Sequence, residues 1–155
     1  MSQNLEGTLR VANNIFFKEV KEILSSGKDV LFTINGNSMR PFLSHGDKVL
    51  ISPHNYNDLK IGKIILAKSK FGYVLHRLVW KNNTKIWLAG DNNLVQIEEI
   101  EIKDILGFVK YAESNKERIN VQSFVHITLS MLWFILRPLR LFIYKTKVLL
   151  RLKYL

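Results

Sequence analysis

The chain of 155 residues contains no cysteine, which excludes disulfide bonds and metal sites with thiolate ligands. Its four histidines, at positions 45, 54, 76 and 126, show no metal-ligand spacing, so we expect neither a metal nor another cofactor. Internal repeats and low-complexity tracts are also absent. With 47% apolar residues, the chain is long enough for one compact core.

Long apolar runs are missing too, since the longest, Met131–Leu136, has six residues and a membrane-spanning helix needs roughly 20. Residues 121–155 carry six basic residues and no acidic one, within a net charge of +10. On a helix, their polar side chains form a stripe opposite an apolar face. The stripe comprises Gln122, His126, Arg137, Arg140, Lys147 and Arg151.

This pattern predicts an amphipathic helical segment, within residues 113–155, that lies in a membrane surface. Pro138 is a candidate break between two helices. A helix that docks on a partner protein is an alternative. Contact with nucleic acid is less favoured, because aliphatic residues far outnumber the polar ones between them.

The N-terminal region lacks the basic-then-apolar pattern of a secretory signal over Met1–Asn14. We therefore expect a membrane-associated protein on the cytoplasmic face. From Thr8 to Ser26, apolar residues recur with helical spacing, with Thr8 as a candidate N-cap and Gly27 as a candidate stop. An amphipathic helix is expected within residues 1–29.

Residues 30–112 have the short apolar runs and turn residues of β-strands. A hairpin is expected around Lys81-Asn82-Asn83. The fold class is therefore mainly β: a coiled antiparallel β domain with an N-terminal helix and a C-terminal amphipathic helical segment. The expected strands are Val30–Ile34, Lys48–Ile51, Ile64–Ala67, Tyr73–Trp80, Ile86–Leu88 and Ile105–Tyr111.

A candidate catalytic serine, Ser38, lies in a turn between two of these runs. A hydroxyl is a weak nucleophile without a base. His76, an ionisable residue in an otherwise apolar strand, is the candidate base, and Asp91 in Gly-Asp-Asn-Asn is the candidate carboxylate that orients it. Backbone amides of the turn, which includes Asn37 and Met39, are the candidate oxyanion donors.

Each candidate has a structural alternative. Ser38 could cap a short helix, and His76 could be a strand histidine bonded to backbone. Asp91 could bond its own turn, because Gly-Asp-Asn-Asn is also an ordinary turn sequence. We expect Arg77 to make a structural ion pair or backbone contacts, and Asp47 to shape the turn before the next strand.

Together, the motifs resemble those of the signal peptidase I and LexA clan of serine peptidases. They are Gly36-x-Ser38-Met39-x-Pro41-x-Leu43, Gly46-Asp47-x-Val49, His76-Arg77 and Gly90-Asp91-Asn92. The resemblance covers residues 30–112. The base is a lysine in bacterial signal peptidases and LexA proteins, so His76 resembles the archaeal and ER-type branch. Gly36 stands where signal peptidases usually carry a serine that assists the oxyanion hole, as in LexA-like proteins.

The resemblance implies a signal-peptidase-like serine endopeptidase that cleaves leader or signal segments of precursor peptides, with the substrate extended along a strand edge. One alternative is a non-catalytic, membrane-anchored peptide-binding module. Another is a LexA-like self-processing regulator, disfavoured because roughly 30 residues before the first strand are too few for a helix-turn-helix domain. All motif residues precede position 112, so cleavage is expected not to need residues 121–155.

Overall fold

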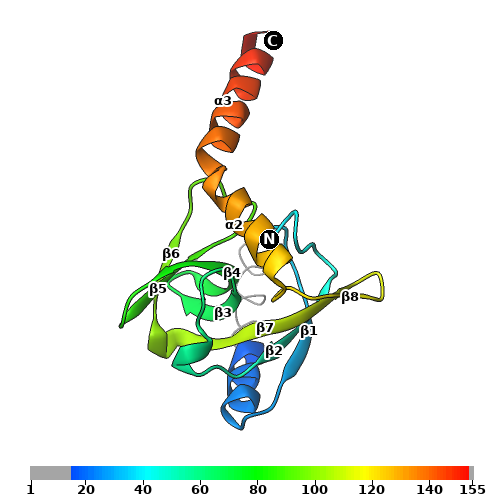
Figure 1. The fold of residues 1–155 in the computed structure, drawn as a ribbon, viewed down its shortest axis with the longest axis vertical. Helices are drawn as coiled ribbons and strands as arrows, with labels where there is room; N and C mark the ends of the chain where they lie inside the picture. Colours follow the sequence, from blue (N-terminus) through cyan, green and yellow to red (C-terminus); the bar gives the residue numbers. More distant parts are fainter. Residues whose placement is uncertain (1–14, 154–155) are drawn as a thin grey trace, which may run out of the picture.

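The N-terminal helix of the computed structural model, drawn in blue in Figure 1, covers residues 15–25. The structure describes residues 15–153, and the side chains up to residue 150, so the expected N-cap Thr8 lies outside the described residues. The helix stops just before Gly27, which has a φ of +83°. Lys28 N–H donates to the Ile23 carbonyl and Gly27 N–H to the Leu24 carbonyl, which is the hydrogen-bond pattern of a Schellman motif. The predicted stop at Gly27 is confirmed.

An antiparallel sheet of eight strands follows the helix and coils around the core (Figure 1). The strand order is β1-β2-β7-β3-β4-β5-β6, and β8 pairs with β7. Breaks in register between Leu50 and Ile51, Leu66 and Ala67, and Leu78 and Trp80 mark bulges that favour coiling. The strands are β1 (Val30–Thr33), β2 (Lys48–Ser52), β3 (Ile64–Ser69), β4 (Gly72–Lys81), β5 (Lys85–Ala89), β6 (Glu98–Glu101), β7 (Ile105–Ser114) and β8 (Glu117–Ile119). Short 3-10 turns occupy Tyr56–Asp58 and Ile102–Asp104.

The mainly β prediction is confirmed, including the hairpin of β4 and β5. The strands that the sequence did not reveal are β6 and β8. In β6, three glutamates surround Ile100, a composition with low β-propensity. Ile100 is nevertheless buried and β6 pairs with β5, so burial against the neighbouring strand overrides local preference.

Two apolar clusters form the core. In the first, Val20 and Leu24 of the N-terminal helix pack against residues of β2, β3 and β7. The second lies among β3, β4, β5 and β6 and includes Leu78, Leu88 and Ile100. Between them, these clusters hold β4 in place along its length, and β4 carries His76.

Two helices end the described chain, α2 (Phe124–Ile135) and α3 (Arg137–Lys153). They meet at a bend of 52°, and α3 extends away from the sheet (Figure 1). Pro138 lies in the first turn of α3, where a missing N–H costs nothing. Of the described helices, none is by itself long and apolar enough to span a membrane; α2 and Arg137–Leu150 of α3 meet those criteria only as a bent pair.

The expected polar stripe does not form one exposed face. The bend turns α3 away from the axis of α2, and Arg137 is only 6% exposed. Arg137 and Arg140 instead hydrogen-bond to loops of the β domain. The exposed basic side chains of α3 that the structure describes are Lys145 and Lys147.

Candidate active site

Ser38 and His76 lie together in the structure. Ser38 belongs to the turn after β1, which is closed by hydrogen bonds from Phe42 N–H and Leu43 N–H to the Met39 carbonyl. His76 lies in the middle of β4 and is 5% exposed. Its Nε2 is 3.1 Å from Ser38 Oγ, within reach for direct proton transfer.

The other ring nitrogen of His76 contacts a carboxylate that the sequence analysis did not select. His76 Nδ1 is 2.9 Å from Glu98 Oε2, and both side chains are buried. The neutral tautomer that satisfies both contacts carries its proton on Nδ1 and leaves Nε2 free to accept from Ser38. Glu98 Oε1 also accepts a hydrogen bond of 2.8 Å from Gln96 Nε2, so both carboxylate oxygens have a partner.

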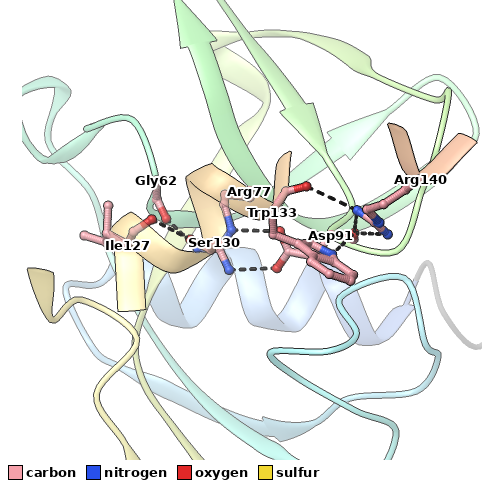
Figure 2. Close-up of polar contacts among 7 residues, drawn as sticks. All are labelled: Gly62, Arg77, Asp91, Ile127, Ser130, Trp133 and Arg140. Carbon is pink, nitrogen blue, oxygen red and sulfur yellow. Dashed lines mark hydrogen bonds and ion pairs between the residues drawn. The ribbon is translucent and has the colours of Figure 1, made fainter. Parts of the chain in front are cut away.

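Asp91 does not occupy the expected position beside His76. Its Oδ1 accepts from Arg77 Nε at 2.8 Å and its Oδ2 from Arg77 Nη2 at 2.7 Å (Figure 2). Neighbouring residues of a strand point to opposite faces, so a carboxylate engaged with Arg77 is turned away from His76. The structure therefore corrects the assignment: Glu98, rather than Asp91, makes the hydrogen bond to His76.

The Arg77–Asp91 pair is a buried structural ion pair, as expected for Arg77. Arg77 is 0% exposed and also donates to the Gly62 carbonyl at 2.6 Å. Burial raises the pKa of the Asp91 carboxyl, and the hydrogen bonds and charge of Arg77 oppose that rise. The pair fixes the strand that carries His76 to the loop after β5.

Through its backbone, the Gly-Asp-Asn-Asn loop also supports the serine turn. Asn92 N–H donates to the Ser38 carbonyl at 2.8 Å. A Cβ on residue 90 would lie 2.8 Å from that same carbonyl oxygen, so only glycine permits the approach. The Asp91 carbonyl accepts from Trp133 Nε1 and from the guanidinium of Arg140 (Figure 2).

Asn37 and Met39 flank the serine in different environments. Met39 is 2% exposed, and its side chain belongs to the first core cluster. Asn37 is exposed, and its carbonyl accepts from Arg40 N–H. Their contribution to an oxyanion hole remains a prediction.

Asp47 shapes the turn before β2 as expected, because its Oδ2 accepts from Ser44 N–H at 2.7 Å.

A cleft of about 410 Å³ opens at Ser38 and His76. Its walls come from the N-terminal helix, β1, the serine turn, β3 and β4. Phe17 stacks on Tyr73 with ring centroids 4.2 Å apart, which ties the helix to the strand that carries His76. The apolar lining consists of Phe16, Phe17, Phe32, Ile34, Met39, Leu66, Tyr73, Val74 and Leu75.

Comparison with known proteins identifies the family. A family model described as Peptidase S24-like matches residues 1–110, which include Ser38, His76 and Glu98. The chain belongs to this family. The match agrees with the resemblance to the signal peptidase I and LexA clan. A search of curated proteins found no match.

In this Peptidase S24-like chain, the residue that sequence reasoning missed is Glu98. It follows Asp91 by seven positions and lies in a segment rich in glutamate, so no apolar pattern predicts a strand there. Its one local signal is its spacing from Ile100. Residues two apart in a strand share a face, and Glu98 and Ile100 lie on the buried face of β6. No group of three or more His, Asp or Glu side chains within residues 15–153 is arranged to hold a metal ion.

Proposed function

We propose that this Peptidase S24-like protein is a serine endopeptidase with Ser38 as nucleophile, His76 as general base and Glu98 as the carboxylate that orients the base. The observation that carries the proposal is the continuous line of contacts from Ser38 Oγ to His76 Nε2, at 3.1 Å, and from His76 Nδ1 to Glu98 Oε2, at 2.9 Å. Nucleophile, base and orienting acid are linked in the order that the chemistry requires.

In the proposed mechanism, Ser38 Oγ attacks the scissile carbonyl while His76 Nε2 takes the hydroxyl proton. Glu98 stabilises the imidazolium that forms. Backbone amides of the turn around Ser38 would donate to the oxyanion. His76 then gives its proton to the leaving amine, and activates a water that releases the acyl group from Ser38.

The cleft supports an extended, apolar peptide as the substrate. Its walls combine apolar and aromatic side chains with polar groups, so apolar side chains of a substrate can pack near the cut while its backbone finds polar partners. β1 lies at one end of the strand order and, within residues 15–153, pairs only with β2, so its other edge offers backbone groups to an added strand. A leader or signal segment of a precursor peptide has this character.

Action at a membrane surface, on the cytoplasmic face, is the second part of the proposal. Phe142 and Leu149 of α3 are 65% and 66% exposed, and neighbouring Lys145 and Lys147 are exposed as well. Such a surface can bury apolar side chains among lipid tails and place lysines near anionic headgroups. This would bring the cleft close to precursors with apolar leaders.

The decisive experiment is mass spectrometry of apolar leader peptides incubated with the wild-type protein, with Ser38→Ala or with His76→Gln. We expect cleavage at one site with the wild type and none with either variant. Binding without cleavage would favour the peptide-binding module instead. If only the protein's own chain is cut, in a reaction whose rate is independent of protein concentration, the protein is a self-processing regulator.

A further inference from the structure

Arg137, the first residue of α3, holds the loop that leads to Glu98. It is 6% exposed, and its Nε donates to the Asn93 carbonyl at 2.7 Å while its Nη2 donates to the Gln96 carbonyl at 2.9 Å. Both carbonyls belong to the segment between β5 and β6. A planar guanidinium that bonds two carbonyls three residues apart restricts the shape of that segment.

The same segment continues directly to the candidate catalytic group. Gln96, whose backbone carbonyl accepts from Arg137, donates through its side chain to Glu98 Oε1 at 2.8 Å. Glu98 Oε2 then contacts His76 Nδ1. Three successive hydrogen bonds thus join the start of α3 to the imidazole.

The loop has little packing of its own to hold it. Val95 is 75% exposed and Ile97 is 45% exposed, so apolar burial contributes little over residues 95–97. Arg137 is absent from the salt bridges formed within the described part of the chain, so its buried charge is compensated by carbonyl dipoles. Burial and, to a smaller extent, the charge of Arg140 lower the pKa of its guanidinium, and the nearby charges of Glu98 and Asp91 oppose this.

We propose that Arg137 is a positioning residue, which sets the place of Glu98 and thereby the tautomer of His76 through the Asn93–Gln96 segment. The proposal deepens the proposed function and rests on it for its kinetic consequence. If Arg137 has this role, the docked C-terminal helices help to hold the catalytic groups in place before the substrate binds.

The first test reads the His76 tautomer directly, and so does not depend on peptidase activity. In ¹⁵N-labelled protein, the His76 signals are assigned by their loss in His76→Gln. We expect the wild type to hold the Nδ1–H tautomer, and Arg137→Gln to shift His76 toward the Nε2–H tautomer, as Glu98→Gln does. The matched control Arg118→Gln removes an exposed arginine that stacks on Tyr111. A wild-type tautomer in folded Arg137→Gln would overturn the proposal.

The second test is a kinetic double-mutant cycle. Arg137→Gln should lower kcat about 10- to 100-fold with little change in KM, because misplacement of a catalytic group by about 1 Å has effects of this order. The double variant Arg137→Gln/Glu98→Gln should be no slower than Glu98→Gln alone, since Arg137 acts through Glu98. Multiplicative losses would show that Arg137 acts elsewhere, and would overturn the proposal.

A folding control separates positioning from loss of structure. If Arg137→Gln fails to fold, Arg137→Lys, which keeps the charge but loses the planar fork, should fold and show the same tautomer shift in smaller measure; a wild-type tautomer and kcat in that variant would overturn the proposal. If wild-type protein cleaves no peptide but the tautomer shift occurs, the positioning role stands and the proposed peptidase function falls.

Discussion

At the scale of the residue, two buried carboxylates near His76 have separate roles. Glu98 hydrogen-bonds to the imidazole, whereas Asp91 forms a two-pronged pair with Arg77. Both are acidic and both follow β5 closely in sequence. They differ in the face of β4 that each one reaches. Substitution of Glu98 is therefore expected to affect activity, and substitution of Asp91 to affect stability.

Glu98→Gln should lower kcat by roughly 10²- to 10⁴-fold with little loss of stability, because an amide neither balances the imidazolium charge nor fixes the tautomer. Asp91→Asn should instead lower the free energy of unfolding by up to about 3–5 kcal/mol, because it leaves the buried Arg77 guanidinium without a counter-charge. Peptide cleavage and denaturant unfolding of both variants measure the two effects.

The reverse outcome would restore the original assignment of Asp91. If Asp91→Asn unfolds at the wild-type denaturant concentration but loses turnover, and Glu98→Gln remains active, then Asp91 orients the base in the working enzyme. Glu99→Gln serves as a control, since that neighbouring carboxylate is exposed and pairs with Lys85.

At the scale of the element, α2 is held against the β domain by a close fit near its start. A Cβ on Gly62 would lie 2.5 Å from Ile127 Cγ2, so the loop before β3 touches the helix surface. His126 packs edge-on to Phe42, and its Nε2 is buried without a hydrogen-bond partner in the described structure. Protonation of this histidine would place a charge where no acceptor is available.

Acid should therefore weaken the docking of α2. Burial, with a smaller contribution from the charge of Arg77, lowers the pKa of His126 from 6.5 to about 4. Between these values the unfolded chain binds a proton that the folded chain excludes, so stability is full above pH 6.5 and falls as the pH drops toward 4. Because the side chain is only half-buried, we expect a loss on the order of 1 kcal/mol.

Urea unfolding at pH 7.5 and pH 4.5 checks this prediction. His126→Gln should reduce the difference in unfolding free energy between the two pH values, whereas His45→Gln, at an exposed position, should leave it unchanged. An identical difference in wild type and His126→Gln would show that other groups cause the acid sensitivity.

At the scale of the whole molecule, the C-terminal helices have two separable parts. Trp133, Arg137 and Arg140 bond to the loop after β5, whereas the C-terminal part of α3 extends away from the sheet (Figure 1). The expectation that cleavage is independent of residues 121–155 overlooks the first part. The active site and the helix pair share the Gly-Asp-Asn-Asn loop and the segment that leads to Glu98.

Two truncations distinguish these parts. A chain that ends at Tyr144 should still cleave a short soluble peptide at near the wild-type rate but bind vesicles with anionic lipid more weakly, because it lacks Lys145, Lys147 and Leu149. A chain that ends at Gln122, which keeps the buried Val121, should lose at least about tenfold in kcat because the loop contacts are gone. Vesicle flotation and peptide cleavage provide the measurements.

The outcome for either truncation can contradict this division. Full activity in the chain that ends at Gln122 would make the helix pair dispensable for the site. Unchanged flotation of the chain that ends at Tyr144 would assign lipid binding to α2 and residues 137–144 of α3, and absence of flotation in the intact protein would make α3 a surface for a protein partner.

Elements that depend on local pattern are predictable from the amino-acid sequence. Alternating apolar residues predict most strands of the sheet, helical spacing and Gly27 predict the N-terminal helix and its end, and Pro138 indicates the division of the C-terminal segment. The serine turn and the histidine strand were likewise visible, because each is a short motif. These features depend on neighbours within a few positions along the chain.

Contacts between polar groups, in contrast, depend on how the elements pack in three dimensions. Glu98 reaches His76 across 22 positions and Arg137 reaches Asn93 across 44, through the pairing of β5 with β6 and the docking of α2 and α3. Asp91 and Glu98 are chemically alike in the sequence, and local spacing favoured Asp91. The order of strands and the face on which each carboxylate emerges settle the choice, because hydrogen bonds of about 3 Å depend on positions in space and not on distance along the chain.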